Sequence, residues 1–163
     1  MGSSHRPDGT GRDERLIRTA MAQAALAIAS GNPPFGAVLT DQFDEIVVAG
    51  HNTQVSTSDP TAHAEINVLR AGGAIRGAPS LDGWKLFVNA EPCSMCLSAI
   101  VKSGIAELTF GAPHEPHLDP YLPAADVLAR TKRPPRVTGG VLADECAAQI
   151  AAARNETGVA PVD

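Results

Sequence analysis

The sequence is short of cysteine and of long apolar runs, and each shortage excludes a class of protein. Three cysteines in 163 residues are too few for a disulfide framework and agree with a reducing cytoplasm, where we expect the protein to work. No apolar run approaches the ~20 residues that a membrane-spanning helix requires, so we expect a soluble protein with no membrane partner. The opening residues, 1–5, lack the apolar stretch of a secretory signal.

Positive charge is also scarce. The chain carries 13 Lys and Arg against 18 Asp and Glu, a formal net charge of −5, whereas proteins that grip nucleic acid normally show a basic face. The densest basic cluster, at 130–136, lies in a proline-containing stretch and is most simply interpreted as a solvated connection before a strand. From Val141 onward the only basic residue is Arg154. The composition therefore predicts no nucleic-acid partner.

Length and residue spacing predict one domain with an α/β fold. We expect a disordered N-terminal tail at 1–13, a single domain at 14–156 and a short C-terminal tail at 157–163. Apolar spacing predicts helices at 14–29, 63–73, 94–103, 124–130 and 143–154, and strands at 35–40, 45–50, 85–89, 107–110 and 137–141. Alternating strands and helices predict a sheet covered on both faces. The helix between the last two strands allows them to run parallel.

Two short motifs contain residues of the kind that bind zinc. A His-Ala-Glu unit occupies residues 63–65, and a Pro-Cys-Ser-Met-Cys unit occupies residues 92–96. A closed structural zinc site takes four protein ligands, whereas a catalytic site keeps three and leaves the fourth position for water. Two helix N-termini converging on one ion would help to stabilise thiolates and a hydroxide. The expected ligands are His63, Cys93 and Cys96, with Glu65 left over to accept a proton from the water.

Two other interpretations of the cysteines are open. A Cys-x-x-Cys unit can be a redox pair, but that account gives no role to Pro92 or to the upstream His-Ala-Glu unit. A closed structural zinc site would need Cys146 as its fourth ligand. Cys146 fits better as a small core residue, because it shares an apolar helical face with Leu142 and Ile150.

The strings at 59–66 and 91–96 resemble the cytidine deaminase superfamily, in the branch of tRNA adenosine deaminases, guanine deaminases and fungal cytosine deaminase. The H-x-E and P-C-x-x-C pattern is the signature of zinc-dependent nucleobase deaminases. Over about residues 15–155 the resemblance implies a three-layer α/β/α sandwich with a five-stranded mixed sheet, a Zn²⁺ cofactor and a homodimer. It also implies that Glu65 shuttles protons, that Asn52 hydrogen-bonds the substrate heterocycle and that the backbone of Ala64 makes a second contact.

Within the branch the strings point in two directions. Residues 141–146 and 59–65 are similar to the tRNA enzymes, whereas Phe35 in the string 34–38 is similar to the free-base enzymes. The proline-rich segment 113–123 departs from the tRNA enzymes, and we expect it to select the substrate, since binding residues concentrate on such loops. It offers Asp119 as an acceptor for an exocyclic amine, Tyr121 for stacking and His117 as a further contact. The alternative is a rigid surface connection.

Three functions follow, in order of preference. The first is zinc-dependent hydrolytic deamination of a small free aminated heterocycle, such as guanine, cytosine or an amino-triazine, with water as co-substrate and ammonia as product. The alternative is a tRNA-specific adenosine deaminase. The third is a catalytically idle zinc-binding domain, against which the intact Glu65 counts, because a structural site has no use for a carboxylate aimed at water.

Overall fold

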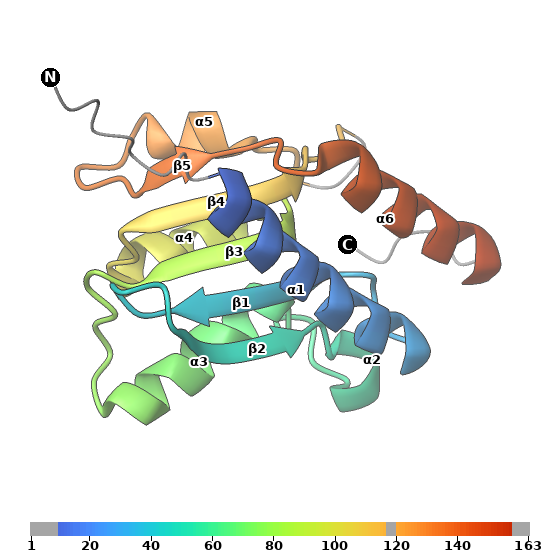
Figure 1. Cartoon of the computed structure of the whole chain (residues 1–163), viewed down its shortest axis with the longest axis horizontal. Coiled ribbons are helices and arrows are strands. Elements are labelled where there is room, and N and C mark those ends of the chain that lie inside the picture. Colours follow the sequence, from blue (N-terminus) through green and yellow to red (C-terminus); the bar gives the residue numbers. More distant parts are fainter. Residues whose placement is uncertain (1–9, 117–119, 158–163) are drawn as a thin grey trace, which may run out of the picture.

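The computed structural model describes residues 10–116 and 120–157, which form a five-stranded sheet with helices on both faces (Figure 1). The strands are β1 (Gly36–Thr40), β2 (Ile46–His51), β3 (Lys85–Ala90), β4 (Glu107–Ala112) and β5 (Arg136–Thr138). The helices are α1 (Thr10–Ala29), α2 (Gln54–Thr57), α3 (Ala64–Arg76), α4 (Ser94–Ser103), α5 (Ala124–Leu128) and α6 (Ala143–Thr157).

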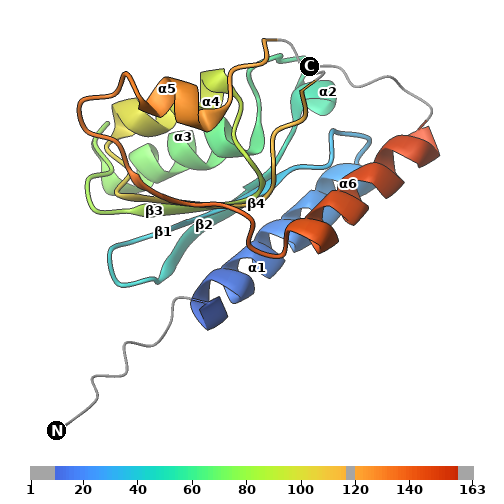
Figure 2. The same ribbon diagram turned by 90° about the horizontal axis from the view of Figure 1, so that it is seen from above.

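The sheet is mixed and has the order β2-β1-β3-β4-β5. Strand β1 runs antiparallel to both β2 and β3, whereas β3, β4 and β5 are parallel. Helices α1 and α6 cover one face, and α3, α4 and α5 cover the other (Figure 2). The predicted three-layer sandwich and its parallel last strands are confirmed. The carboxyl ends of parallel strands lie at one edge of such a sheet, where α/β proteins bind ligands.

The core lies in two layers, because successive strand residues point to opposite faces. Strand β1 is buried along its whole length. Leu39 and Leu86 pack toward α3 and α4, whereas Val38 and Phe87 pack toward α1. At Gly36 a side chain would collide with the Ala20 carbonyl group, so glycine allows α1 to approach the sheet closely.

Helix α1 begins at Thr10, four residues before the predicted start, so residues 10–13 are helical and do not belong to a tail. The reason is a set of ion pairs that fixes this turn. The Arg12 guanidinium lies 2.8 Å from the Asp13 carboxylate, 3.2 Å from Asp44 and 3.2 Å from Glu107. Asp44 lies on the β1–β2 turn and Glu107 on β4, so helical periodicity in the sequence could not reveal these two ion pairs.

Two further predictions of local structure were wrong. Helix α3 continues through Gly72 to Arg76 and ends at Gly77, whose φ of 72° is left-handed. Gly72 is inside the helix because Leu39 packs where its side chain would be and the Trp84 ring would stand 3.3 Å away. Helix α2 lies between the predicted strand 45–50 and the predicted helix 63–73, where no helix was predicted, and its N–H groups at Val55 and Ser56 bond to the buried side chain of Asn32.

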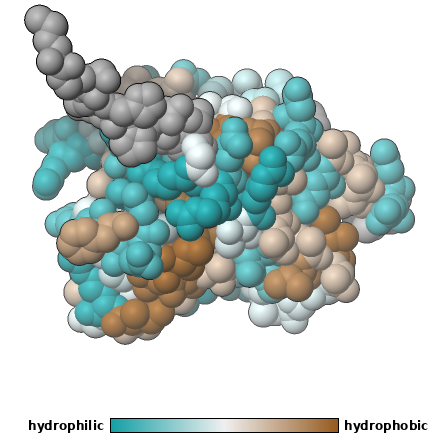
Figure 3. Space-filling model, viewed as in Figure 1, coloured by the Kyte–Doolittle hydropathy of each residue, from teal (hydrophilic) through white to brown (hydrophobic). Residues whose placement is uncertain are grey.

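Within the described part of the chain, no helix combines the length and apolarity needed to cross a membrane. Hydrophilic and hydrophobic residues are interspersed over the face drawn in Figure 3.

Candidate zinc and active site

The three expected zinc ligands lie at the N-termini of two helices. His63 and Cys93 are the N-cap residues of α3 and α4, and both have extended backbones, with ψ of 156° and 170°. Cys96 lies one turn into α4. His63 is therefore just outside the helical turn in which it was expected. The predicted convergence of two helix N-termini is confirmed.

The distances among the ligand atoms fit a tetrahedral zinc ion. Nδ1 of His63 lies 3.6 Å from Sγ of Cys93 and 3.4 Å from Sγ of Cys96. With Zn–S bonds of about 2.3 Å and a Zn–N bond of about 2.05 Å, a tetrahedral site separates nitrogen from sulfur by about 3.6 Å. All three ligand atoms lie within 4.8 Å of one another. One imidazole and two thiols are also a typical zinc donor set.

Cys146 is not a fourth ligand. It lies on α6, on the face of the sheet opposite α3 and α4 (Figure 2), and is fully buried beside Leu16 and Ile17. In the described segments, the only cluster of three or more residues suited to a metal ion is the His63, Cys93 and Cys96 group. A closed zinc site with Cys146 as its fourth ligand is therefore excluded, and residues 10–116 and 120–157 supply three ligands.

The electrostatics of the three ligands favour a cation between them. Hydrogen bonds from Cys96 and His63 lower the pKa of Cys93 to about 4, although burial opposes this. The pKa of Cys96 is raised, because its thiol donates to the Cys93 thiolate and is desolvated. Burial lowers the pKa of His63, but the hydrogen bond to Cys93 and the charge of Glu65 raise it by a larger amount, so the net shift of the pKa is upward. A divalent ion would take the place of these shared protons.

Glu65, the second residue of α3, is buried beside the ligands. Its side chain is 6% exposed, and its Oε2 lies 3.5 Å from Sγ of Cys96. Burial raises the pKa of its carboxyl group, with the charge of His63 opposing. A buried carboxyl group next to a metal site is suited to accept and return a proton.

Asn52 lies at the end of β2 and is almost fully buried, but its side chain is already bonded within the protein. Its Oδ1 accepts the backbone N–H of Gln54 at 2.9 Å, and its Nδ2 donates to Oε1 of Gln54 at 2.6 Å. The Asn67 amide on α3 donates to the His51 carbonyl at 2.9 Å. The end of β2 is thereby fixed against α3, and the Gln54 side chain occupies the Nδ2 donor of Asn52.

The other expected substrate contacts lie in different places. Ala64 is the first residue of α3, where a backbone N–H has no acceptor within the helix. Phe35 is half-buried and packs against the core on both faces of the sheet. Tyr121 is 47% exposed and stacks on His114, with ring centroids 5.7 Å apart. His117 and Asp119 lie outside the described residues.

Two buried or half-buried polar residues of the site escaped sequence reasoning. Asn89 on β3 accepts the Gly36 N–H and donates to the Pro34 carbonyl, each at 3.0 Å, and so holds the peptides on both sides of Phe35. Glu91 accepts two backbone N–H groups of the segment after β4. The available signal was a polar side chain at the carboxyl end of an otherwise apolar strand.

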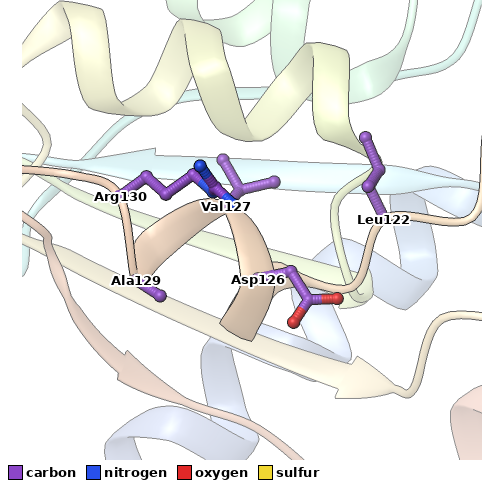
Figure 4. Close-up of a pocket in the computed structure, with 5 residues that line it drawn as sticks. All are labelled: Leu122, Asp126, Val127, Ala129 and Arg130. Atoms are coloured by element: carbon purple, nitrogen blue, oxygen red, sulfur yellow. The ribbon is translucent and has the colours of Figure 1, made fainter.

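A separate hollow of about 580 Å³ lies beside α5 (Figure 4). Its lining contains neither a zinc ligand nor an expected substrate contact, and consists of Leu122, Asp126, Val127, Ala129 and Arg130.

Comparison with known proteins agrees with this site. The family described as the cytidine and deoxycytidylate deaminase zinc-binding region matches residues 10–112. A tRNA-specific adenosine deaminase of Haemophilus influenzae is 37% identical over 147 residues, covering 85% of this chain and 80% of that protein. The chain also matches a tRNA(Ile)-lysidine synthase of Thermus thermophilus, but spans only 24% of its length.

Solved structures point the same way. A structure from a study of A-to-I editing by tRNA:A34 deaminases has a TM-score of 0.77 and 29% identity, covering 83% of this chain and 98% of that one. Guanine deaminase from Bacillus subtilis has a TM-score of 0.59 and 30% identity, covering 74% of this chain and 70% of that one. With its fold and its three-ligand centre in agreement, this chain belongs to the zinc-dependent cytidine and deoxycytidylate deaminase family.

Proposed function

We propose that this chain deaminates adenosine to inosine in tRNA by zinc-dependent hydrolysis. The observation that carries the proposal is the 37% identity with a tRNA-specific adenosine deaminase over 85% of the chain. These relatives favour the function that the sequence analysis placed second. They give no support to the expectation that nucleic acid is not a partner.

In this proposal, His63, Cys93 and Cys96 hold the zinc ion, and Glu65 moves protons. The bound ion supplies a Lewis acid that lowers the pKa of a water molecule to about 7. Glu65 would accept one proton from the attacking water as the water oxygen bonds to C6 of the adenine ring, and would pass that proton to the ring nitrogen N1. It would then carry the proton of the new C6 hydroxyl group to N6, so that the C6–N6 bond breaks, ammonia leaves and a C6 carbonyl group remains. The position of the Glu65 carboxyl group beside Cys96 suits it to both transfers.

The proposal assigns the orientation of the heterocycle to two groups of this chain. The Ala64 N–H, at the positive end of α3, is suited to a ring or exocyclic acceptor. The Asn52 Nδ2 can supply a donor once the Gln54 side chain has moved. Ala64 directly follows His63, and Asn52 directly follows the end of β2. Both groups therefore lie at the zinc-binding edge of the sheet.

A free purine base such as guanine is the second candidate substrate. It is favoured by the 30% identity with guanine deaminase and by the state of the chain's cations. Some of these cations already lie next to carboxylates, which reduces the positive charge that the protein offers to RNA phosphates. The cations in such ion pairs include Arg12, Arg18, Lys85, Arg136 and Arg154.

Ammonia release from zinc-loaded protein distinguishes the candidates. The substrate panel is a tRNA anticodon stem-loop carrying adenosine, free adenosine, guanine, cytosine and an amino-triazine. Release from the stem-loop alone, with a rate that falls steeply as salt is raised, is the expected result. Release from guanine alone would replace the tRNA proposal by the second candidate, and release from none would contradict both.

Glu65→Gln tests the mechanism for either substrate. The variant should keep one zinc per chain and lose about 10²-fold to 10⁴-fold in kcat, the usual contribution of a general acid and base. Near-normal turnover would exclude the proton-shuttle role. A Glu65→Gln protein that cannot hold zinc would show that the carboxylate supports the metal instead. The homodimer stays a prediction, which sedimentation velocity can check.

A further inference from the structure

Glu91 connects the zinc-binding peptide to both ends of the segment that follows β4. It comes two residues before Cys93, and its backbone N–H donates to the Ala112 carbonyl at 2.8 Å. One oxygen of its carboxylate accepts the His114 N–H at 2.6 Å, and the other accepts the Ala124 N–H at 3.0 Å. A single side chain therefore fixes two points that are ten residues apart.

Those two N–H groups depend on Glu91 for their acceptors. Ala124 is the first residue of α5, and the N-cap residue of that helix, Pro123, provides no side-chain bond. Carboxylate to N–H bonds are charge-assisted and about twice as strong as neutral ones. Between the two anchors, the His114 and Tyr121 rings stack with an angle of 8° between their planes. The first and last parts of the segment are thus tied to each other and to Glu91.

The segment and the zinc ligands also share one edge of the sheet. Strands β3 and β4 are parallel, and Ala90 pairs with Ala112 at their carboxyl ends. Cys93 follows the end of β3, and the segment beginning at residue 113 follows the end of β4. Loops at this edge carry the binding residues of α/β proteins.

We propose that Glu91 is a positioning residue that fixes residues 113–116 and 120–124 relative to Cys93 and thereby determines substrate affinity. This inference rests on the proposed deaminase function. It assigns to Glu91 neither zinc binding nor proton transfer. Its effect is transmitted through the backbone at His114 and Ala124.

Glu91→Gln is the main test, because it keeps the size of the side chain but replaces one acceptor oxygen by an NH₂ donor. Asp126→Asn is the matched control, because it removes a negative charge from Asp126, an exposed residue of α5. Hydrogen exchange at the amides of His114 and Ala124 should quicken by about 10-fold or more in Glu91→Gln, given the strength of such bonds. Exchange should be unchanged at those amides in the control.

Kinetics provide the second measurement. For the substrate found active, the KM of Glu91→Gln should rise by about 10-fold or more, with kcat within about 3-fold of wild type and zinc content unchanged, because a loss of ground-state contacts raises KM. Glu91→Asp keeps the charge, but its side chain is too short to reach both N–H groups, so its KM should lie between those of wild type and Glu91→Gln. It also serves if Glu91→Gln does not fold.

The failure of each proposal is distinguishable. Unchanged exchange at both amides, or faster exchange with wild-type KM, would overturn the positioning role. Loss of zinc from both Glu91 variants would also overturn it, since the residue would then support the metal. If the wild-type protein releases ammonia from no substrate, the deaminase proposal fails and the effect on affinity falls with it, whereas hydrogen exchange still decides whether Glu91 anchors the segment.

Discussion

Replacement of Asn89 by alanine should destabilise the protein through two backbone groups at once. The Asn89 side chain is fully buried on β3, accepts the Gly36 N–H and donates to the Pro34 carbonyl. Alanine cannot do either. The Gly36 N–H and the Pro34 carbonyl would then lose these side-chain partners at the entrance to β1, and a cavity would be left where the amide was.

The expected cost follows from those two groups. Leaving one buried polar group unsatisfied costs about 1 to 3 kcal/mol. Partial entry of water offsets some of the cost of the pair, so we expect a loss of about 3 kcal/mol in the free energy of unfolding. For a chain of this length each kcal/mol lowers the Tm by about 2 to 4 °C. The Asn89→Ala protein should therefore melt about 6 to 12 °C below wild type.

Urea denaturation of zinc-loaded protein, followed by circular dichroism, measures this difference directly. Asn155→Ala on α6 is the control, because Asn155 is exposed and its replacement should change stability by no more than about 0.5 kcal/mol. The urea m-value should be the same in all three proteins. An Asn89→Ala protein within about 0.5 kcal/mol of wild type would refute the argument that this amide holds the entrance to β1.

Three other perturbations have defined outcomes. Burial raises the pKa of Asp44, but the hydrogen bond from Lys85 and the charge of Arg12 lower it by a larger amount, so the net pKa lies below the ordinary value for aspartate. Its contribution to stability is therefore complete above its unfolded pKa and is lost as the pH falls below about 4. In Asp44→Asn the free energy of unfolding, measured by urea titration at a series of pH values, should fall less steeply with decreasing pH than in wild type. An unchanged dependence on pH would contradict the assignment. Removal of zinc with a chelator should abolish turnover and lower the Tm, since a ligand present at 1,000 times its Kd stabilises the folded state by about 4 kcal/mol, and added Zn²⁺ should restore both. Gln54→Ala frees the Asn52 amide, so the KM should fall by about 2-fold to 5-fold with kcat unchanged, and a higher KM in steady-state assays would show that Gln54 orients Asn52 instead.

Much of the fold was accessible from periodicity. Helix α4 has the predicted bounds, 94–103, because its apolar face and its ends at Cys93 and Gly104 are all determined by residues within or next to the helix. The end of α3 was misplaced because Gly72 normally signals a helix end, whereas here it makes room for Leu39. The start of α1 was misplaced because the ion pairs of Arg12 reach the distant Asp44 and Glu107.

The sequence by itself determined the donor set of the metal site and the spare Glu65, because zinc chemistry demands particular residue types at short spacings. Only the tertiary structure decided how these groups meet and what holds them. His63 reaches Cys93 across 30 positions, the Glu91 carboxylate spans 23 and 33 positions to its two N–H partners, and Asn89 reaches Gly36 across 53. Bonds between residues so far apart leave no periodic signal in the chain, since they depend on which strand ends the fold brings to the same edge of the sheet.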